Sequence, residues 1–219
     1  MLESAGMPKP SAAARARKIK LILFDVDGVL TDGKIWIFPA PAASPTSAQA
    51  KTIDRSSQGV PAEVEGGFLL QSSSLIEAKG FHAHDGTAIM LARTAGIKTG
   101  IITKRISETV ALRARDLKID HVYQGIQDKA EVFRQILEKD GITASEAAFV
   151  GDDVIDLPAM RKCGLAIAVK NARPEVKAAA HLTTPHAGGD GAARDAVEYI
   201  LKAQGKWQRA VESYIAEKD

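Results

Sequence analysis

The chain has 219 residues, of which 45% are hydrophobic and 26% are charged. This balance is typical of a soluble globular protein, and the length suits one domain with a substantial core. The net charge of +2 and the aromatic fraction of 5% argue against nucleic acid as a partner. Cys163 is the single cysteine, which excludes an internal disulfide and favours a reducing, cytoplasmic compartment. No apolar stretch reaches the ~20 residues of a membrane span, so we expect no membrane partner.

The composition predicts one domain over residues 18–204 with a tail at each end. Residues 1–17 are rich in Ala, Pro, Ser and Arg without periodicity, and they lack the apolar segment of a secretory signal, so we expect a flexible N-terminal tail. Residues 205–219 predict a C-terminal tail, which is either a frayed end or a segment that reaches a neighbouring subunit. Residues 39–67 are rich in Pro, Ser and Ala and predict a flap inserted into the domain.

The first predicted strand covers residues 19–24, because an apolar run that is flanked by charge and followed by glycine is typical of a buried strand. Residues 34–38 alternate in a way that predicts one arm of a small β-hairpin. Residues 68–70 and 74–78 predict the returning arm on the other side of the flap insertion.

Strands and helices alternate from residue 84 onward. Gly96 and Gly141 are expected to end two of the helices, and Ser107 is expected to cap a third. The predicted strands cover 98–103, 120–123, 147–150, 165–169 and 181–184, and the predicted helices cover 86–95, 108–117, 129–139, 154–162, 174–179 and 192–203. Such alternation predicts an α/β fold, with a doubly wound, Rossmann-like parallel sheet flanked by helices.

Two carboxylates, Asp25 and Asp27, directly follow the first strand, and Gly28 then permits a sharp turn. The carboxyl ends of parallel strands are where α/β sheets bind ligands. Two close carboxylates repel each other unless a cation or a shared proton relieves them, and Mg²⁺ prefers such oxygen ligands. One carboxylate could then be a nucleophile while the other transfers protons. An EF-hand loop is disfavoured because Trp36 stands where it needs Glu, whereas a simple acidic turn remains the alternative.

Further polar residues stand at the ends of later predicted strands. Thr103 follows one strand, Lys129 opens a helix, and Asp152, Asp153 and Asp156 follow another strand. Each has an ordinary interpretation, as a strand-end threonine, a solvated lysine or an acidic helix N-terminus. Together, however, a hydroxyl, an ammonium and added carboxylates are the groups that a magnesium–phosphate site requires.

The order of these motifs resembles that of the haloacid dehalogenase superfamily over about residues 19–203. The segments that carry the resemblance are DVDGVLTDG, IITKR, Lys129 and GDDVIDLPAM. The resemblance implies that Asp25 is the nucleophile and forms an aspartyl-phosphate, while Asp27 protonates the leaving alcohol and then activates water. It further implies that Thr103 and Lys129 bind the phosphoryl group. Mg²⁺ would be held by Asp25, the backbone carbonyl of Asp27 and Asp152, with Asp153 and Asp156 in supporting positions.

The spacing between Thr103 and Lys129 leaves no room for a large cap domain, which indicates the capless branch with only a hairpin flap. Within that branch the segments LTDG, FHAHDG and HAGGDGAARDAVEYIL resemble the phosphatases of 3-deoxy-D-manno-octulosonate 8-phosphate, which serve lipopolysaccharide synthesis. The resemblance implies a homotetramer in which the flaps pack together and a neighbour closes each active site. It implies these substrate-binding residues: Asp27, His82, Ala83, His84, Asp85, Gly86, Met90, Arg105, Arg113 and Lys129.

Two positions depart from that family. Lys104 replaces the usual Gly, and Met90 stands where an Arg commonly contacts substrate. Met90 therefore favours an alternative substrate, either a nine-carbon acid 9-phosphate or another sugar phosphate. A non-catalytic oligomerisation module is the alternative from another class, and the intact set of acidic residues argues against it.

Overall fold

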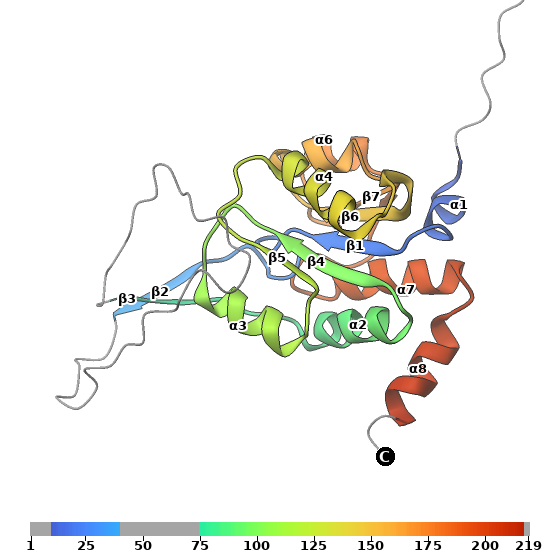
Figure 1. Cartoon of the computed structure of the whole chain (residues 1–219). Coiled ribbons are helices and arrows are strands. Elements are labelled where there is room, and N and C mark those ends of the chain that lie inside the picture. The colour runs from blue at the N-terminus through green and yellow to red at the C-terminus, as the bar shows by residue number, and fades with distance from the viewer. Residues whose placement is uncertain (1–9, 40–74, 217–219) are drawn as a thin grey trace, which may run out of the picture.

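The structure is a computed structural model that describes residues 10–39 and 75–216. At its centre six parallel strands are arranged in the order β5-β4-β1-β6-β7-β8 (Figure 1). Chain order reverses at β1, so the sheet is doubly wound, as the sequence predicts. The strands are β1 (Leu21–Phe24), β4 (Lys98–Ile102), β5 (His121–Tyr123), β6 (Ala147–Gly151), β7 (Leu165–Ala168) and β8 (Leu182–Thr183).

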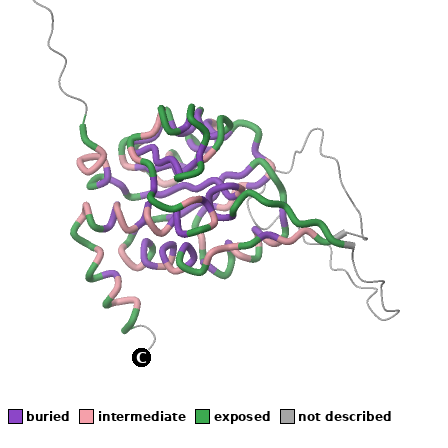
Figure 2. The backbone as a smooth tube through the Cα atoms, turned by 180° about the vertical axis from the view of Figure 1, so that it is seen from behind, coloured by how far each residue is buried: buried purple, intermediate pink, exposed green. Residues whose placement is uncertain are grey.

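The central strands are buried on both faces, which is why they are continuous apolar runs in the sequence. Every residue of β1, β6 and β7 is buried, and Figure 2 shows the buried part of the chain concentrated in the sheet. Phe24 pairs with Ile101 of β4 and with Val150 of β6. The residues that follow these three strands therefore meet at one edge of the sheet.

Helices cover both faces of the sheet, with α4 and α6 on one side and α2, α3 and α7 on the other (Figure 1). The predicted helix over 154–162 is wrong as a single helix, because a 3₁₀ turn precedes a short helix there. The helical elements are α1 (Ala12–Ala16), α2 (Ala83–Thr94), α3 (Glu108–Asp116), α4 (Lys129–Asp140), η2 (Ala144–Glu146), η3 (Val154–Asp156), α5 (Leu157–Met160), α6 (Pro174–Ala179), α7 (Ala192–Ala203) and α8 (Trp207–Ala216).

The capping residues behave partly as expected. Gly141 ends α4 in the left-handed region, with φ of 63°, and Gly96 follows α2 with φ of 76°. Ser107 precedes α3 but makes no capping hydrogen bond with its side chain. Its backbone N–H instead donates to Oε1 of Gln124 at 2.8 Å.

A small antiparallel hairpin projects from the sheet edge at which β1 and β4 end (Figure 1). Its strands are β2 (Trp36–Pro39) and β3 (Leu75–Ala78), which confirms the arms predicted over 34–38 and 74–78. Residues 40–67 of the expected flap insertion, and the segment 68–70, lie outside the described residues. The hairpin exposes large apolar side chains, namely Trp36, Ile37, Phe38 and Ile76. In the described residues there is no large cap domain.

The segment just before β1 is helical where we expected a flexible tail. In α1 the hydroxyl of Ser11 accepts from the N–H of Ala14 at 3.2 Å, and Ala16 is fully buried. Nε2 of Gln204 donates to the carbonyl oxygens of Ala16 and Ile19 at 3.0 and 2.7 Å. The tail prediction is therefore wrong for the residues of α1, which are fixed to α7.

Residues 207–216 form α8, which is neither frayed nor extended away from its own chain. Ala210 is buried, and the guanidinium of Arg194 lies 4.6 Å from the ring centroid of Trp207. The hydroxyl of Tyr214 lies 4.0 Å from the sulfur of Met90 in α2. The domain therefore extends to α8 rather than ending at residue 204. Over the described ranges, no helix is long and apolar enough to cross a membrane.

Candidate active site

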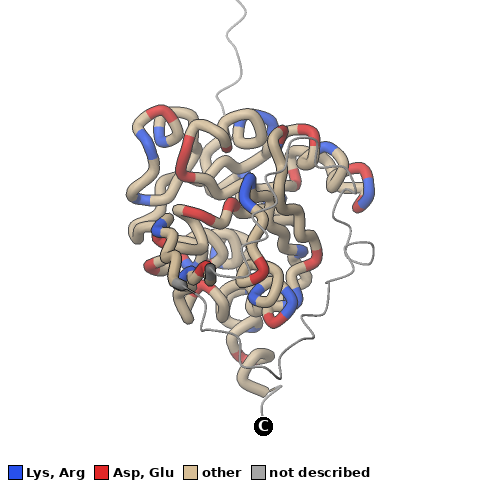
Figure 3. The backbone as a smooth tube through the Cα atoms, turned by 90° about the vertical axis from the view of Figure 1, so that its left-hand side faces the viewer, with Lys and Arg blue, Asp and Glu red and all other residues tan. Residues whose placement is uncertain are grey.

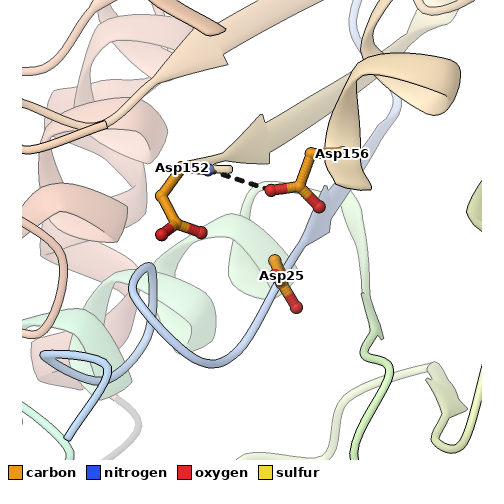
Figure 4. A group of neighbouring side chains, drawn as sticks. All are labelled: Asp25, Asp152 and Asp156. Atoms are coloured by element: carbon orange, nitrogen blue, oxygen red, sulfur yellow. Dashed lines mark hydrogen bonds between the residues drawn. The ribbon is translucent and has the colours of Figure 1, made fainter. Parts of the chain in front are cut away.

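Three carboxylates converge at the carboxyl edge of the sheet (Figure 4). Asp25 follows β1, Asp152 follows β6, and Asp156 lies in η3. One oxygen from each lies within 4.8 Å of the others, and the N–H of Asp152 donates to Asp156 at 2.9 Å. Figure 3 looks onto this edge and shows acidic positions gathered at its middle with a basic segment beside them. We refer to Asp25, Asp152 and Asp156 as the acidic cluster.

Lys129 is buried at the first residue of α4 and supplies a cation to this cluster. Its Nζ lies 2.8 Å from Oδ2 of Asp25 and 2.7 Å from Oδ1 of Asp156. Asp128 caps α4 by accepting from the N–H groups of Ala130 and Glu131. This cap fixes where the helix begins and therefore where Lys129 lies. Burial acts to lower the pKa of Lys129, but Asp25 and Asp156 outweigh it and raise the pKa above its ordinary value.

The acidic cluster carries more negative charge than Lys129 can balance. Burial and then Asp156 raise the pKa of Asp25 to about 6, against the opposing effect of Lys129. Burial, Asp156 and Asp25 raise the pKa of Asp152 to about 7. Oδ1 of Asp152 is buried and has no hydrogen-bond partner. Crowded carboxylates with an unpaired oxygen fit a hard divalent cation such as Mg²⁺.

The turn after β1 brings its backbone close to the carboxylate of Asp152. Oδ1 of Asp25 accepts from the N–H of Val26 at 2.7 Å, which fixes the carboxylate against its own turn. Gly28 has φ of 91°, and a Cβ there would lie 2.2 Å from Oδ2 of Asp152. Only glycine lets this backbone pass beside the carboxylate.

A second glycine segment supports that turn from the loop before α7. A Cβ at Gly188 would lie 1.7 Å from the carbonyl oxygen of Gly28, and the N–H of Gly189 donates to the carbonyl of Val29 at 3.0 Å. Through this contact the segment HAGGDGAARDAVEYIL packs directly against the segment DVDGVLTDG, although the two are far apart in the sequence. It holds the backbone that carries Asp27 in place.

The remaining motif residues differ in their surroundings. Thr103 is buried directly after β4, where its backbone N–H donates to Tyr123 at 3.0 Å. Asp153 is exposed and caps η3 by accepting from the N–H of Val154 at 2.7 Å. Asp156 is fully buried and accepts from Lys129 and from two backbone N–H groups, which suits a supporting position.

Asp27 lies beside two cations, one of which the sequence analysis missed. Lys79 has a fully buried side chain and donates to Oδ1 of Asp27. Nε of Arg105 lies 3.8 Å from Oδ2 of the same carboxylate. A lysine at the end of a hairpin is normally solvated. The sequence pattern therefore gave no indication that Lys79 is buried or that it contacts Asp27.

The segment FHAHDG contributes less to the site than expected. Asp85 is buried and accepts from the N–H groups of Gly191 and Arg194 at 3.3 and 2.8 Å, so it caps α7. A Cβ on Gly86 would lie 2.3 Å from Nη2 of Arg113, which shows that Gly86 makes room for this side chain. Both residues therefore serve packing between helices, and substrate binding by Asp85 stays a prediction.

The other predicted substrate residues are divided between the surface and the interior. Ala83 and His84 are exposed at the start of α2, and the rings of His82 and His84 lie 4.9 Å apart. Arg113 lies over the ring of Phe81, 5.9 Å from its centroid. Met90 contacts Tyr214 of α8 within this chain instead of the acidic cluster.

Comparison with known proteins identifies relatives along almost the whole chain. The family model of haloacid dehalogenase-like hydrolases matches residues 86–194. The 3-deoxy-D-manno-octulosonate 8-phosphate phosphatase of Salmonella typhimurium is 36% identical over 205 residues, which cover 94% of this chain and 91% of that protein.

Two solved structures extend the comparison. The 3-deoxy-D-manno-octulosonate 8-phosphate phosphatase of Moraxella catarrhalis, in complex with a magnesium ion, a phosphate ion and KDO, has a TM-score of 0.73. It is 32% identical, with coverage of 93% of this chain and 97% of that one. The cobalt-bound phosphatase of Haemophilus influenzae has a TM-score of 0.69 at 30% identity, with coverage of 88% and 93%.

The fold, the acidic cluster and these relatives show that the chain belongs to the haloacid dehalogenase-like hydrolases. Within that family it is a phosphoric monoester hydrolase that resembles the 3-deoxy-D-manno-octulosonate 8-phosphate phosphatases. The resemblance predicted from the sequence is thereby confirmed.

Proposed function

We propose that the chain is a magnesium-dependent phosphatase that converts 3-deoxy-D-manno-octulosonate 8-phosphate into the free sugar acid and phosphate. The observation that carries this proposal is the acidic cluster around Lys129, in a chain 36% identical to a phosphatase of that name. The reaction would serve lipopolysaccharide synthesis in the cytoplasm.

The side chains of Asp25 and Asp152 and the backbone carbonyl of Asp27 are the groups that would hold Mg²⁺. The bound ion would neutralise the carboxylates and the phosphate oxygens, and so allow an anionic nucleophile to approach an anionic ester. The unpaired Oδ1 of Asp152 and the excess charge of the cluster support this assignment.

The chain's own residues carry out two displacements at phosphorus. An oxygen of Asp25 attacks the phosphorus in line, the bond to the sugar oxygen breaks, and Asp27 gives its proton to that oxygen. Water then attacks the aspartyl-phosphate, Asp27 accepts the proton of that water, and the bond between Asp25 and phosphorus breaks. Lys129 and Thr103 hold the phosphoryl oxygens during both steps. Lys129 also favours the ionised form of Asp25 that the attack requires.

Substrate binding is proposed for residues around the mouth of this edge. Arg105 is partly exposed beside Asp27, and its guanidinium suits the carboxylate of a sugar acid. His82, Ala83 and His84 at the start of α2 are proposed to contact the substrate or a neighbouring subunit. The exposed apolar hairpin supports a homotetramer in which hairpins pack together. Met90, which stands where an Arg is common and here contacts Tyr214, keeps a nine-carbon acid 9-phosphate or another sugar phosphate as the alternative substrate.

Phosphate release from a panel of sugar phosphates, with Mg²⁺ and with EDTA, tests this proposal. We expect the octulosonate 8-phosphate to be hydrolysed fastest and only with the metal. Asp25→Asn should remove this activity, whereas Asp116→Asn, an exposed acidic residue of α3, serves as the matched control. Faster hydrolysis of a nine-carbon acid 9-phosphate would overturn the substrate, and no release from any ester would indicate a non-catalytic module.

A further inference from the structure

Lys79 is the feature of this site that the phosphatase mechanism leaves without a role. Its side chain is fully buried, although it directly follows the exposed hairpin strand β3. A buried ammonium is tolerated only when carboxylates pair with it. Here Nζ donates to Oδ1 of Asp27 and lies 3.7 Å from Oε1 of Glu77.

Four charges of alternating sign form a closed ring at this point. Oε2 of Glu77 lies 2.8 Å from Nη2 of Arg105, whose Nε lies 3.8 Å from Oδ2 of Asp27. The ring joins the turn after β1, the end of the hairpin and the loop after β4. The hydroxyl of Thr109 also donates to the carbonyl of Glu77 at 3.4 Å, so the hairpin is anchored to α3 as well.

This ring restricts what the carboxyl group of Asp27 can do. Lys79 engages Oδ1 from the buried side, while Oδ2 lies toward the partly exposed Arg105. A partial rotation of the carboxyl group would break the contact with Lys79 and leave a buried ammonium with Glu77 alone, whereas a half-turn only exchanges two equivalent oxygens. The group is therefore held with Oδ2 as its available oxygen.

We propose that Lys79 is a positioning residue, which holds Asp27 by Oδ1 and so directs Oδ2 to the reacting oxygens. The inference rests on the proposed role of Asp27 in proton transfer. A proton on Oδ2 passes to the sugar oxygen as its bond to phosphorus breaks. Oδ2 then accepts a proton from the water that attacks the aspartyl-phosphate.

A positioning role and a purely structural role predict different kinetics. If Lys79 acts through Asp27, its loss slows phosphoenzyme formation from an alkyl phosphate, whose leaving oxygen needs a proton. Formation from p-nitrophenyl phosphate needs none and is spared. If Lys79 only fastens the hairpin, both substrates are affected alike.

The experiment measures phosphoenzyme formation in single turnovers of Lys79→Met, using p-nitrophenyl phosphate and whichever sugar phosphate the wild type hydrolyses fastest. That choice keeps the test independent of the octulosonate. We expect a loss of at least about tenfold with the sugar phosphate and less than about twofold with p-nitrophenyl phosphate. Lys34→Met is the matched control, because Lys34 is an exposed lysine that pairs with Asp32 at 3.0 Å. Equal losses with both substrates, or no loss with either, would overturn the proposal.

A double-mutant cycle decides the same question in steady state. Adding Lys79→Met to Asp27→Asn should change kcat by less than about twofold, because the group on which Lys79 acts is already gone. A further loss of about tenfold would show an independent role and contradict the proposal. Circular dichroism establishes whether each variant folds. If Lys79→Met does not, Lys79→Gln, which removes the charge but keeps a polar side chain, replaces it in both tests under the same criteria.

Discussion

Two charge clusters lie at opposite edges of the same sheet, and only one of them is balanced. At the amino edge, Asp140 lies between Lys98 and His121, with distances of 2.9 and 2.8 Å. Burial acts to raise the pKa of Asp140, but hydrogen bonds from Lys98 and His121 outweigh it and lower the pKa. Both carboxylate oxygens have partners, so this cluster is complete without a ligand.

The acidic cluster at the carboxyl edge is the opposite case. Three carboxylates share one lysine, the pKa values of Asp25 and Asp152 are raised, and one buried oxygen has no partner. The pKa shifts are opposite because Asp25 and Asp152 lie deeper in the protein than Asp140 and have fewer compensating donors. An uncompensated charge in a folded interior indicates where a ligand completes the structure.

The largest difference should follow from Asp25→Asn. We expect a loss of kcat of at least about 10³-fold, since the nucleophile is removed. The variant should unfold at the same or a higher temperature than the wild type, because one carboxylate leaves an over-negative cluster. Phosphate release and a thermal melt measure the two effects. Retention of activity would contradict the assignment of Asp25 as the nucleophile. A strong loss of stability would contradict the claim that the acidic cluster carries excess negative charge.

The second-largest difference between the two clusters should appear in the pH dependence of stability. Because the folded pKa values of Asp25 and Asp152 are raised from 3.8 to about 6 and about 7, the native state binds more protons than the unfolded chain in this window. The free energy of unfolding of the metal-free protein should therefore fall, by about 4 kcal/mol between about pH 5 and pH 8. Urea denaturation in EDTA measures this slope, and saturating Mg²⁺ should flatten it.

Asp140 in the amino-edge cluster has the opposite effect on the pH dependence of stability, because its pKa is lowered. The lowered pKa of Asp140 gives stability that is present above its ordinary pKa and is lost only as the pH falls through the lower folded value. Ionisation of Asp140 therefore does not change the free energy of unfolding between about pH 5 and pH 8. A metal-free protein that became more stable across that interval would contradict the excess of charge in the acidic cluster.

Asp140→Asn should reverse the pattern seen for Asp25→Asn. Removing the charge that Lys98 and His121 contact should cost about 2 kcal/mol of unfolding free energy, because charged hydrogen bonds at a buried position are lost. Activity should remain within about twofold of wild type, since the amino edge takes no part in the chemistry. Chemical denaturation and phosphate release measure both, with the exposed Asp116→Asn as control. A loss of activity without a loss of stability would contradict this assignment.

The smallest effect is expected at Asp85, which caps α7. Asp85→Ala should cost about 1 kcal/mol of unfolding free energy through loss of two hydrogen bonds to the N-terminus of α7. The KM for the sugar phosphate should change by less than about twofold. A selective rise in KM with unchanged stability would restore the substrate-binding role that the motif FHAHDG suggested.

The sheet and the acidic cluster were predictable from the sequence for the same reason. Continuous apolar runs predict strands that are buried on both faces, and residues after such strands meet at one edge. Asp25, Lys129 and Asp152 stand at those points, so their convergence follows from topology. Their raised pKa values do not, because these depend on distances that no pattern specifies.

The features that the sequence did not reveal concern residues whose surroundings depend on how helices pack. Asp85 was predicted to bind substrate from the family resemblance, whereas its hydrogen-bond partners in the structure belong to the start of α7, more than a hundred residues later. Met90 faces α8, and Lys79 is buried only because the hairpin folds back onto Asp27. The short helices α1 and α8 are stabilised by contacts with α7 and α2, which local composition does not reveal.

Calorimetric titration of the metal-free protein with Mg²⁺ tests the central claim most directly, namely that the acidic cluster is left unbalanced in order to bind a cation. In two buffers of different ionisation enthalpy, at a pH near the raised pKa values, we predict tight binding of one ion with release of protons from the cluster. Asp152→Asn should weaken that binding by at least about 100-fold, whereas Asp140→Asn should leave it unchanged. Equal affinity in the wild type and Asp152→Asn, or binding without proton release, would contradict the account.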